Sequence, residues 1–404
     1  MARPAHLGCM SCYFNATRAA GLERLADVTS RLGRIYANQR NTDRGPDAET
    51  SSRLSPYLRR RLILEQEAVG AALAAHGPVQ AEKFVQEVFW RTYFKGNLET
   101  HPAAWTSYQR ELAAGRDRLA TESGLRRIFE DAVAGRTGID GFDDWARELA
   151  ERHWLHNHAR MWFASIWIFT LRLPWALGAD LFLRHLLDGD PASNTLSWRW
   201  VAGLHTRGKA YAARAENILR YTDGRYNPAG LNEHPVALEE ADPPAARHLP
   251  PADQPPTGEV ALLLHLDDLH PESLPLGAAR VSRIGGLLTH VDSAAEAVRQ
   301  ADRDAMADAL SRAEAHFGCP ATLAEGGWTG GLPVVAAWAP VGPAADALPP
   351  CLRVRRQWDS RTWPHATRGF FQVKAAIPAI LDAIGQDRGA TLNPLRHAGA
   401  DARN

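Results

Sequence analysis

The chain lacks the features that would assign it to several specialised protein classes. It has only 4 cysteines among 404 residues, which excludes a disulfide framework and favours a reducing, cytoplasmic location. Lysine plus arginine, 46, equals aspartate plus glutamate, 46, so any nucleic-acid surface must be a local patch. We expect no secretion signal, because the first residues contain no apolar core.

No uninterrupted hydrophobic run is long enough to predict a membrane-spanning helix. The most apolar stretch, "WFASIWIFTLRLPWALG", is interrupted by Arg172 and Pro174 before it reaches that length. We therefore expect a buried core helix in this stretch and no membrane partner.

The four cysteines give little support for a metal site. Cys9 and Cys12 form a C-x-x-C pair, but Cys319 and Cys351 are far from it and from each other. Zinc and iron–sulfur sites need closely spaced pairs of ligands. The sequence favours small buried thiols and no metal, and the role of the C-x-x-C pair stays open.

Tryptophan, in contrast, is abundant, with 13 residues, and 45% of the chain is hydrophobic, as in globular proteins. Residues 1–234 have helical periodicity, residues 235–258 are rich in proline, and residues 259–385 alternate strand-like runs with a helical pattern. The predicted fold class is α plus α/β: an all-helical domain, a linker, and a smaller Rossmann-like domain with a parallel sheet. We expect a flexible tail over residues 386–404.

Three segments place charged and large apolar side chains on one helix face. In "FVQEVFWR", Phe84, Glu87, Trp90 and Arg91 are three or four residues apart. The segments "HNHARM" and "DGDPASNTLSW" have similar spacing. Such a face fits neither a plain core, where an unpaired charge is costly, nor a plain solvated surface. A satisfied helix contact is the simpler interpretation of one segment alone, but three together indicate a lined cavity.

A fourth element, "TSSRLSPYL" at residues 50–58, places hydroxyl groups and an arginine before a proline at a helix start. Hydroxyls and free helix N–H groups suit a phosphate, although alone the pattern is an ordinary helix cap. In this order the four elements resemble the FAD-binding domain of the photolyase/cryptochrome family. "TSSRLSPYL" is similar to the family's phosphate loop, "EVFWR" to its E-x-x-W-R helix, "HNHARM" to its N-x-x-R-M helix, and "DGDPASNTLSW" to its D-x-D-x-x-x-N-x-x-x-W signature.

The resemblance implies that residues 1–234 bind FAD in an all-helical cavity. Arg160 and Asp188 would pair beside the flavin ring, Asp190 would accept from its N3–H, and Asn194 would face N5, where an amide favours the reduced flavin used in repair. The resemblance shows no motif for an antenna, so a second chromophore stays unknown. The implied cofactor-binding set is Tyr36, Ser51, Ser52, Arg53, Leu54, Ser55, Phe84, Arg91, Asn157, Arg160, Asp188, Asp190 and Asn194.

The resemblance further implies a light-driven lyase that splits cyclobutane pyrimidine dimers in UV-damaged DNA. Glu87 would bond a thymine carbonyl and Trp90 would stack on the flipped-out dimer. Asn157 and Met161 match the enzymes for cyclobutane dimers, whereas six–four enzymes carry histidines there. We expect a monomer. The alternative is a cryptochrome-like blue-light photoreceptor that binds FAD without repair, and a third possibility is a flavin-binding partner module.

The family's electron relay is only partly present. Trp198 matches the tryptophan next to the flavin and Trp175 the middle one, but residues 116–127 contain no tryptophan for the exposed position. Trp162 and Trp167 offer another route, although core packing is the simpler interpretation of both.

Two features depart from the family pattern. The α/β segment follows the helical domain instead of preceding it, which suggests a rearranged order of domains. The sequence after Trp200 does not follow the family's sequence closely. We expect DNA phosphates to bind a local basic surface. Contacts of this kind position DNA without reading its sequence. The candidates are Arg59, Arg60, Arg61, Arg207, Lys209, Arg214 and Arg220.

Overall fold

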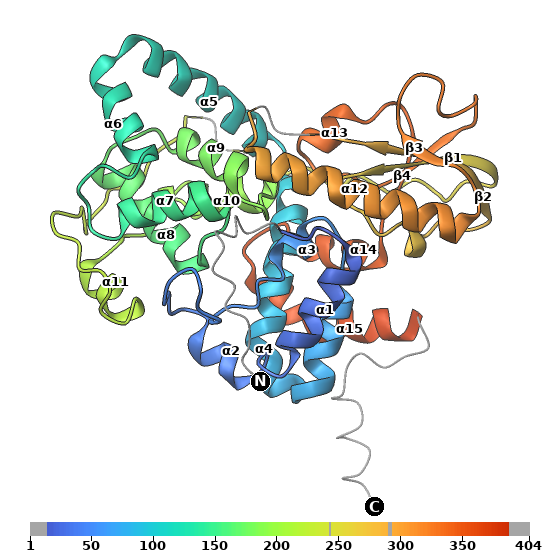
Figure 1. Cartoon of the computed structure of the whole chain (residues 1–404), viewed down its shortest axis with the longest axis horizontal. Helices are drawn as coiled ribbons and strands as arrows, with labels where there is room; N and C mark the ends of the chain where they lie inside the picture. The colour runs from blue at the N-terminus through green and yellow to red at the C-terminus, as the bar shows by residue number, and fades with distance from the viewer. Residues whose placement is uncertain (1–13, 242–243, 290–292, 388–404) are drawn as a thin grey trace, which may run out of the picture.

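The computed structural model describes residues 14–241, 244–289 and 293–387 (Figure 1). The Cys9–Cys12 pair and the tail beyond residue 387 lie outside the described residues, and Cys319 and Cys351 are half-buried rather than fully buried. The part before the linker is helical. In chain order its elements are α1 (Arg18–Thr29), α2 (Arg34–Gln39), α3 (Ser55–Arg59), α4 (Glu65–Thr100), α5 (Ala103–Thr121), α6 (Ser123–Val133), α7 (Phe142–Arg152), α8 (Asn157–Ser165), η1 (Ile166–Thr170), α9 (Trp175–His185), α10 (Pro191–Ala202) and α11 (Ala215–Tyr221).

Helix α4 is kinked where glycine and proline interrupt its pattern. Gly77 has a φ of 69°, which glycine adopts without strain, and Pro78 has no N–H to continue the helical ladder. The second half carries Phe84, Glu87, Trp90 and Arg91, so the kink sets the direction of this functional face relative to the first half.

The most apolar stretch of the chain is buried, as predicted, but it is not one helix. Helix α8 continues into the π-helical turn η1, which ends at Thr170. The helical conformation is interrupted before α9, where Arg172 has a φ of 55°. Trp162 and Trp167 are fully buried in these elements. No helix among the described residues combines the length and apolarity needed to cross a bilayer.

A five-stranded parallel sheet follows, in the spatial order β3-β2-β1-β4-β5. The first strand after the linker is central because its residues 260–264 are buried and apolar. Helix α12 (Glu296–Phe317) covers one face, where it packs on β1, β2 and β3 (Figure 1). The strands are β1 (Gly258–His265), β2 (Ala279–Leu287), β3 (Ala321–Leu323), β4 (Val334–Ala337) and β5 (Leu352–Val354), with η2 (Pro271–Ser273) after β1 and α13 (Pro343–Ala347) after β4.

The proline-rich segment forms neither helix nor strand in its described residues. Backbone hydrogen bonds nevertheless fix it, since Leu238 N–H donates to Ala202 O at 2.9 Å and Arg247 N–H to Thr100 O at 2.7 Å. It therefore lies against the end of α4 and the end of α10 as it passes to the sheet.

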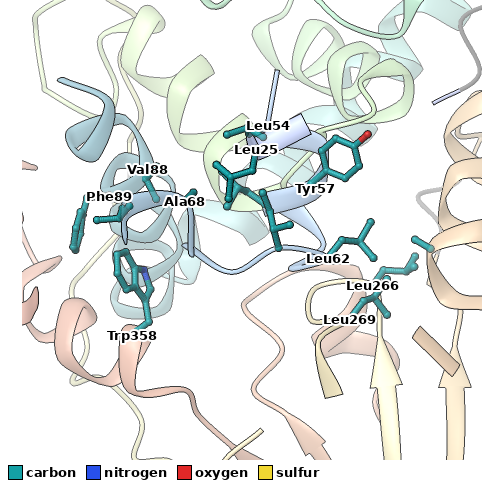
Figure 2. Close-up of a cluster of buried hydrophobic side chains, with 14 of the residues drawn as sticks. Leu25, Leu54, Tyr57, Leu62, Ala68, Val88, Phe89, Leu266, Leu269 and Trp358 are labelled. Carbon is teal, nitrogen blue, oxygen red and sulfur yellow. The ribbon is translucent and has the colours of Figure 1, made fainter. Parts of the chain in front are cut away.

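The last helices return to the helical part of the molecule. Helices α14 (Gln357–Thr362) and α15 (Phe371–Asp387), with η3 (Trp363–His365) between them, pack against α4 (Figure 1). One buried cluster consequently joins residues 16–93 with residues 260–384, and Figure 2 shows Phe89 beside Trp358 within it. A second cluster lies within residues 98–226. The division of the chain into the predicted domains stays a proposal.

The arginine triplet after α3 corrects one expectation from the sequence. Arg59, Arg60 and Arg61 were candidates for an exposed DNA surface, yet Arg60 and Arg61 are each 2% exposed. Their partners lie far along the chain: Arg59 pairs with Asp267, Arg60 with Asp302 at 2.6 Å, and Arg61 with Asp359 at 2.7 Å. A buried cation is stable only with such partners, so these arginines join the helical part to the α/β part.

Candidate functional site

The predicted cofactor residues meet around Asp188, in the turn before α10. Arg160 of α8 pairs with this carboxylate at 3.0 Å, and the Ser55 hydroxyl at the start of α3 donates to it. Burial opposes the charge of Asp188, but Arg160, Arg91 and the Ser55 hydroxyl together lower its pKa. Two of the three mixed helix faces, through Arg91 and Arg160, and the phosphate-loop segment, through Ser55, thus converge on an anionic group of the third.

Asp190, two residues later, has a structural role and an unexpected partner. Its carboxylate accepts from Ser193 N–H at 2.7 Å and so caps α10. The Lys95 ammonium lies 3.5 Å from the same carboxylate, and both side chains are 2% exposed. Burial alone raises the pKa of Asp190, yet the charges of Lys95, Arg91 and Arg59 lower it to about 2. The group is therefore an anion at neutral pH.

Tyr36 of α2 forms a second group with Phe84 and Glu87, which lie on one face of α4. The rings of Tyr36 and Phe84 meet edge to face, with centroids 5.4 Å apart. Glu87 pairs with Arg40 at 2.6 Å. Burial raises the pKa of Glu87 despite this cation, so the site opposes the negative charge of the carboxyl.

Three buried donor atoms in the predicted cofactor-binding set have no hydrogen-bond partner among the described residues. These are Ser51 Oγ and Arg53 Nε from the phosphate-loop segment and Arg91 Nη1 from α4. Buried donors are normally satisfied, and a bound pyrophosphate accepts from groups of both kinds. The residues present therefore fit FAD. The cavity beside Tyr36, Ser51 and Ser52 is only about 10 Å³, about one water, so side chains must separate for a dinucleotide to enter there.

Other members of the predicted set lie in different surroundings. The guanidinium of Arg53 lies 4.8 Å from the centroid of the Trp154 ring. The backbone of Arg53 has a φ of 54°. Leu54 is fully buried in the core. Asn194 donates its amide hydrogen to Ala179 O at 2.7 Å, which leaves its carbonyl oxygen for another group.

The four residues expected to contact DNA differ in exposure. Asn157 is exposed, Glu87 and Met161 are half-buried, and Trp90 is half-buried beneath a second aromatic ring. Phe370 stacks on Trp90, with ring centroids 3.9 Å apart and planes 12° apart. The ring face that would take a base is thus in contact with the segment before α15.

The two predicted relay tryptophans lie in separate aromatic contacts. Trp198 meets Trp167 edge to face, with centroids 6.4 Å apart. Trp175 lies 5.9 Å from Tyr108, which in turn lies 5.1 Å from Trp105. Helix α5 therefore supplies aromatic rings beyond Trp175 although it has no tryptophan over residues 116–121.

A larger cavity, about 500 Å³, opens beside the second half of α4. It lies between α4, the start of α5, the end of α10 and the segment before α15. None of the residues predicted to bind FAD, contact the lesion or relay electrons lines it, but Arg207, a candidate for contact with DNA phosphates, does. Its lining residues are Tyr93, Asn97, His101, Ala104, Leu196, Arg199, Leu204, His205, Thr206, Arg207, Glu240, Pro244, Thr367, Arg368 and Gly369.

Sequence reasoning missed Lys95, Arg40 and Phe370. Lys95 follows Arg91 by four residues, so the periodicity of α4 could have placed it on the same face. Helical periodicity could not have found Arg40 or Phe370. Arg40 pairs with Glu87 and Phe370 stacks on Trp90, and both contacts join distant parts of the chain.

Part of the chain is similar to known proteins. Residues 84–230 match the family described as the FAD binding domain of DNA photolyase. A deoxyribodipyrimidine photo-lyase of Streptomyces griseus is 32% identical over 204 residues, which are 47% of this chain and 43% of that protein. One from a Synechococcus species is 30% identical over 190 residues, 45% of this chain and 38% of its own length. The chain thus spans less than half the length of these curated relatives.

The solved structure of a Synechocystis cryptochrome matches part of this chain. It is 24% identical, has a TM-score of 0.42, and the match covers 51% of this chain and 43% of the cryptochrome.

Proposed function

Because residues 84–230 carry the FAD-binding domain of DNA photolyases, we propose that this chain is a flavoprotein that splits cyclobutane pyrimidine dimers in DNA under blue light. The observation that carries the proposal is the convergence of Ser55, Arg91 and Arg160 on Asp188, because three separate motifs supply these groups. Bound FAD would supply the electron that opens the dimer. The protein would bind the cofactor and position the lesion.

The chain's own residues would hold the cofactor by charge and hydrogen bonding. Ser51 and Arg91 each have an unpaired donor for a pyrophosphate oxygen. Asp190 is an anion that can accept from an N–H group of a planar ring, and Asn194 has a free carbonyl oxygen. Arg160 and Asp188 would form the polar wall beside that ring.

On the DNA side, Glu87 would stabilise the charge that develops on the lesion. A protonated carboxyl donates a hydrogen bond to a carbonyl oxygen, and burial favours this form by raising the pKa of Glu87. Asn157, which is exposed, and Met161, which is half-buried, lie on α8 where they would contact the extruded dimer. Trp90 would stack on the lesion once Phe370 has moved from its face.

The same contacts favour one alternative, a cryptochrome-like photoreceptor that binds FAD without repair. Glu87 is paired with Arg40 and Trp90 is covered by Phe370, so both groups already have partners. A photoreceptor needs neither group free for DNA.

Illumination of the reduced, flavin-loaded chain with dimer-containing DNA separates the two functions. Repair restores the ultraviolet absorbance of thymine. Glu87→Gln should lower the repair yield while flavin content stays unchanged, with Glu82→Gln, an exposed acid on the same helix, as the control. Full flavin occupancy without recovery of thymine would favour the photoreceptor.

A further inference from the structure

The cavity of about 500 Å³ has the size of a small-molecule site and is distinct in its lining from the predicted flavin site. Its floor is buried and partly apolar, formed by Tyr93, Ala104, Leu196 and Leu204. A planar ligand ring that covers these side chains would remove their apolar surface from water, which is favourable.

A buried ion pair with two unused atoms lies in the wall. Arg199 of α10 pairs with Glu240 of the linker segment, and Arg199 is 2% exposed. Arg199 Nη1 and Glu240 Oε2 are both buried, and neither has a hydrogen-bond partner among the residues that the structure describes. Leaving a donor and an acceptor unsatisfied is costly, so this pair is suited to a ligand edge that offers an acceptor beside a donor. Every nucleobase has such an edge.

Uncharged hydrogen-bonding groups lie beside this pair. Tyr93 Oη is 2.9 Å from His205 Nε2, and burial, with the nearby Arg199 charge, lowers the pKa of His205 to about 4. His205 is therefore neutral at pH 7. Asn97 donates to Ala366 O at 2.9 Å, which holds the rim segment against α4.

The mouth of the cavity is cationic. Arg207 and Arg368 line it, both are exposed, and neither forms an ion pair within the part of the chain that the structure describes. Since Glu240 is balanced by Arg199, these two arginines leave the opening with a positive charge. An arginine fork at a cavity mouth suits a phosphate group.

We propose that this cavity binds a nucleoside monophosphate unit, with the base on the floor against Arg199 and Glu240 and the phosphate between Arg207 and Arg368. The unit comes either from a free nucleotide or from an undamaged nucleic-acid strand. The site shares no residue with those proposed to hold FAD, and Arg207 is its one residue in common with the predicted DNA-contacting surface.

Calorimetric titration of the flavin-loaded full chain with GMP tests the proposal. We expect saturable binding that weakens at least about tenfold with guanosine, which lacks the phosphate, and with inorganic phosphate, which lacks the base. Arg199→Gln should weaken GMP binding by a similar factor. The double change Arg207→Gln and Arg368→Gln should weaken it too and reduce its dependence on salt.

Arg214→Gln is the matched control, because Arg214 is exposed nearby but does not line the cavity. Flavin absorbance in every variant reports separately on the flavin site. A ten-nucleotide undamaged single strand that competes with GMP identifies a strand as the source, and failure to compete identifies the free nucleotide. Absence of saturable GMP binding, or unchanged binding in both the Arg199 and the double variant, would overturn the proposal.

Discussion

The ring of Phe370 lies on the ring of Trp90, with 3.9 Å between centroids and 12° between planes. Phe370 belongs to the segment between η3 and α15, about 280 residues after Trp90 by sequence number, so only the return of the chain to α4 creates the contact. The geometry is that of a base stacked on an aromatic platform. Phe370 therefore competes with the lesion proposed to bind there.

We expect Phe370→Leu to strengthen the binding of dimer-containing DNA by at least about threefold, because leucine stays apolar but cannot stack. Fluorescence anisotropy of labelled DNA measures the change. Phe371→Leu is the control, since Phe371 is 81% exposed. Unchanged affinity in Phe370→Leu would mean that Trp90 does not receive the base.

Arg91→Gln should lower flavin affinity by at least about tenfold, because a charge-assisted contact to phosphate is lost. The ratio of flavin to protein absorbance after gel filtration measures the effect. Lys83→Gln, on the exposed side of the same helix, should retain flavin. Circular dichroism of both variants shows whether the helices are intact. Full flavin content in folded Arg91→Gln would remove Arg91 from the site.

Arg61→Met should destabilise the chain by about 3–5 kcal/mol, because it leaves the buried carboxylates of Glu65, Asp268 and Asp359 without their shared cation. Urea unfolding measures the loss. Arg118→Met, which breaks another i,i+4 pair with an exposed glutamate, should leave the midpoint unchanged. Equal midpoints for the two variants would contradict the proposed role of the buried network.

Glu148 should make stability depend on pH. Burial and the charge of Asp43 raise the pKa of Glu148 to about 7 from its ordinary value of 4.5, and Arg225 offsets this only in part. The native chain thus keeps a proton between these values that the unfolded chain has lost, so this carboxyl lowers stability as pH rises through the window. Glu148→Gln cannot ionise. It should match the parent at pH 4 and exceed it by about 1–3 kcal/mol at pH 8.

Urea unfolding at both pH values measures the difference between Glu148→Gln and the parent. Glu151→Gln, an exposed neighbour on α7, should show no such trend. A constant difference at both pH values would exclude titration of Glu148 as the cause.

Tyr108→Phe should slow light-driven reduction of bound flavin several-fold, because Tyr108 lies between Trp175 and Trp105 and phenylalanine is much harder to oxidise. Trp167→Phe tests the other route, through the contact with Trp198. Absorbance of the flavin during illumination with an external reductant measures the rate. If flavin reduction is slow in Trp167→Phe and has the parent rate in Tyr108→Phe, the electron relay runs through Trp167 and Trp198.

Local pattern was enough to predict the long elements. The runs that became β1 and α12 have a buried strand pattern and a helical period, and the structure contains both. β3 and β5 have three residues each, too few for a period, and β2 mixes arginine and glycine with its apolar positions, so none was predicted.

Spacing alone predicted the site only where partners share a helix face, whereas the family resemblance supplied the pair of Arg160 and Asp188. Glu87 and Arg91 follow from spacing on α4, whereas the contact between Asp190 and Lys95 joins two helices and depends on how they pack. The arginine triplet was misassigned for the same reason. Its composition indicates a basic surface, and only the tertiary fold brings Asp267, Asp302 and Asp359 to it.

The core that joins residues 16–93 with residues 260–384 has a consequence for synthesis on the ribosome. The first helices to emerge cannot complete their apolar interior until α14 and α15 have been translated, whereas residues 98–226 hold an interior of their own. We expect the middle of the chain to become protease-resistant first. A nascent chain arrested before residue 357 should still expose the helices at its beginning.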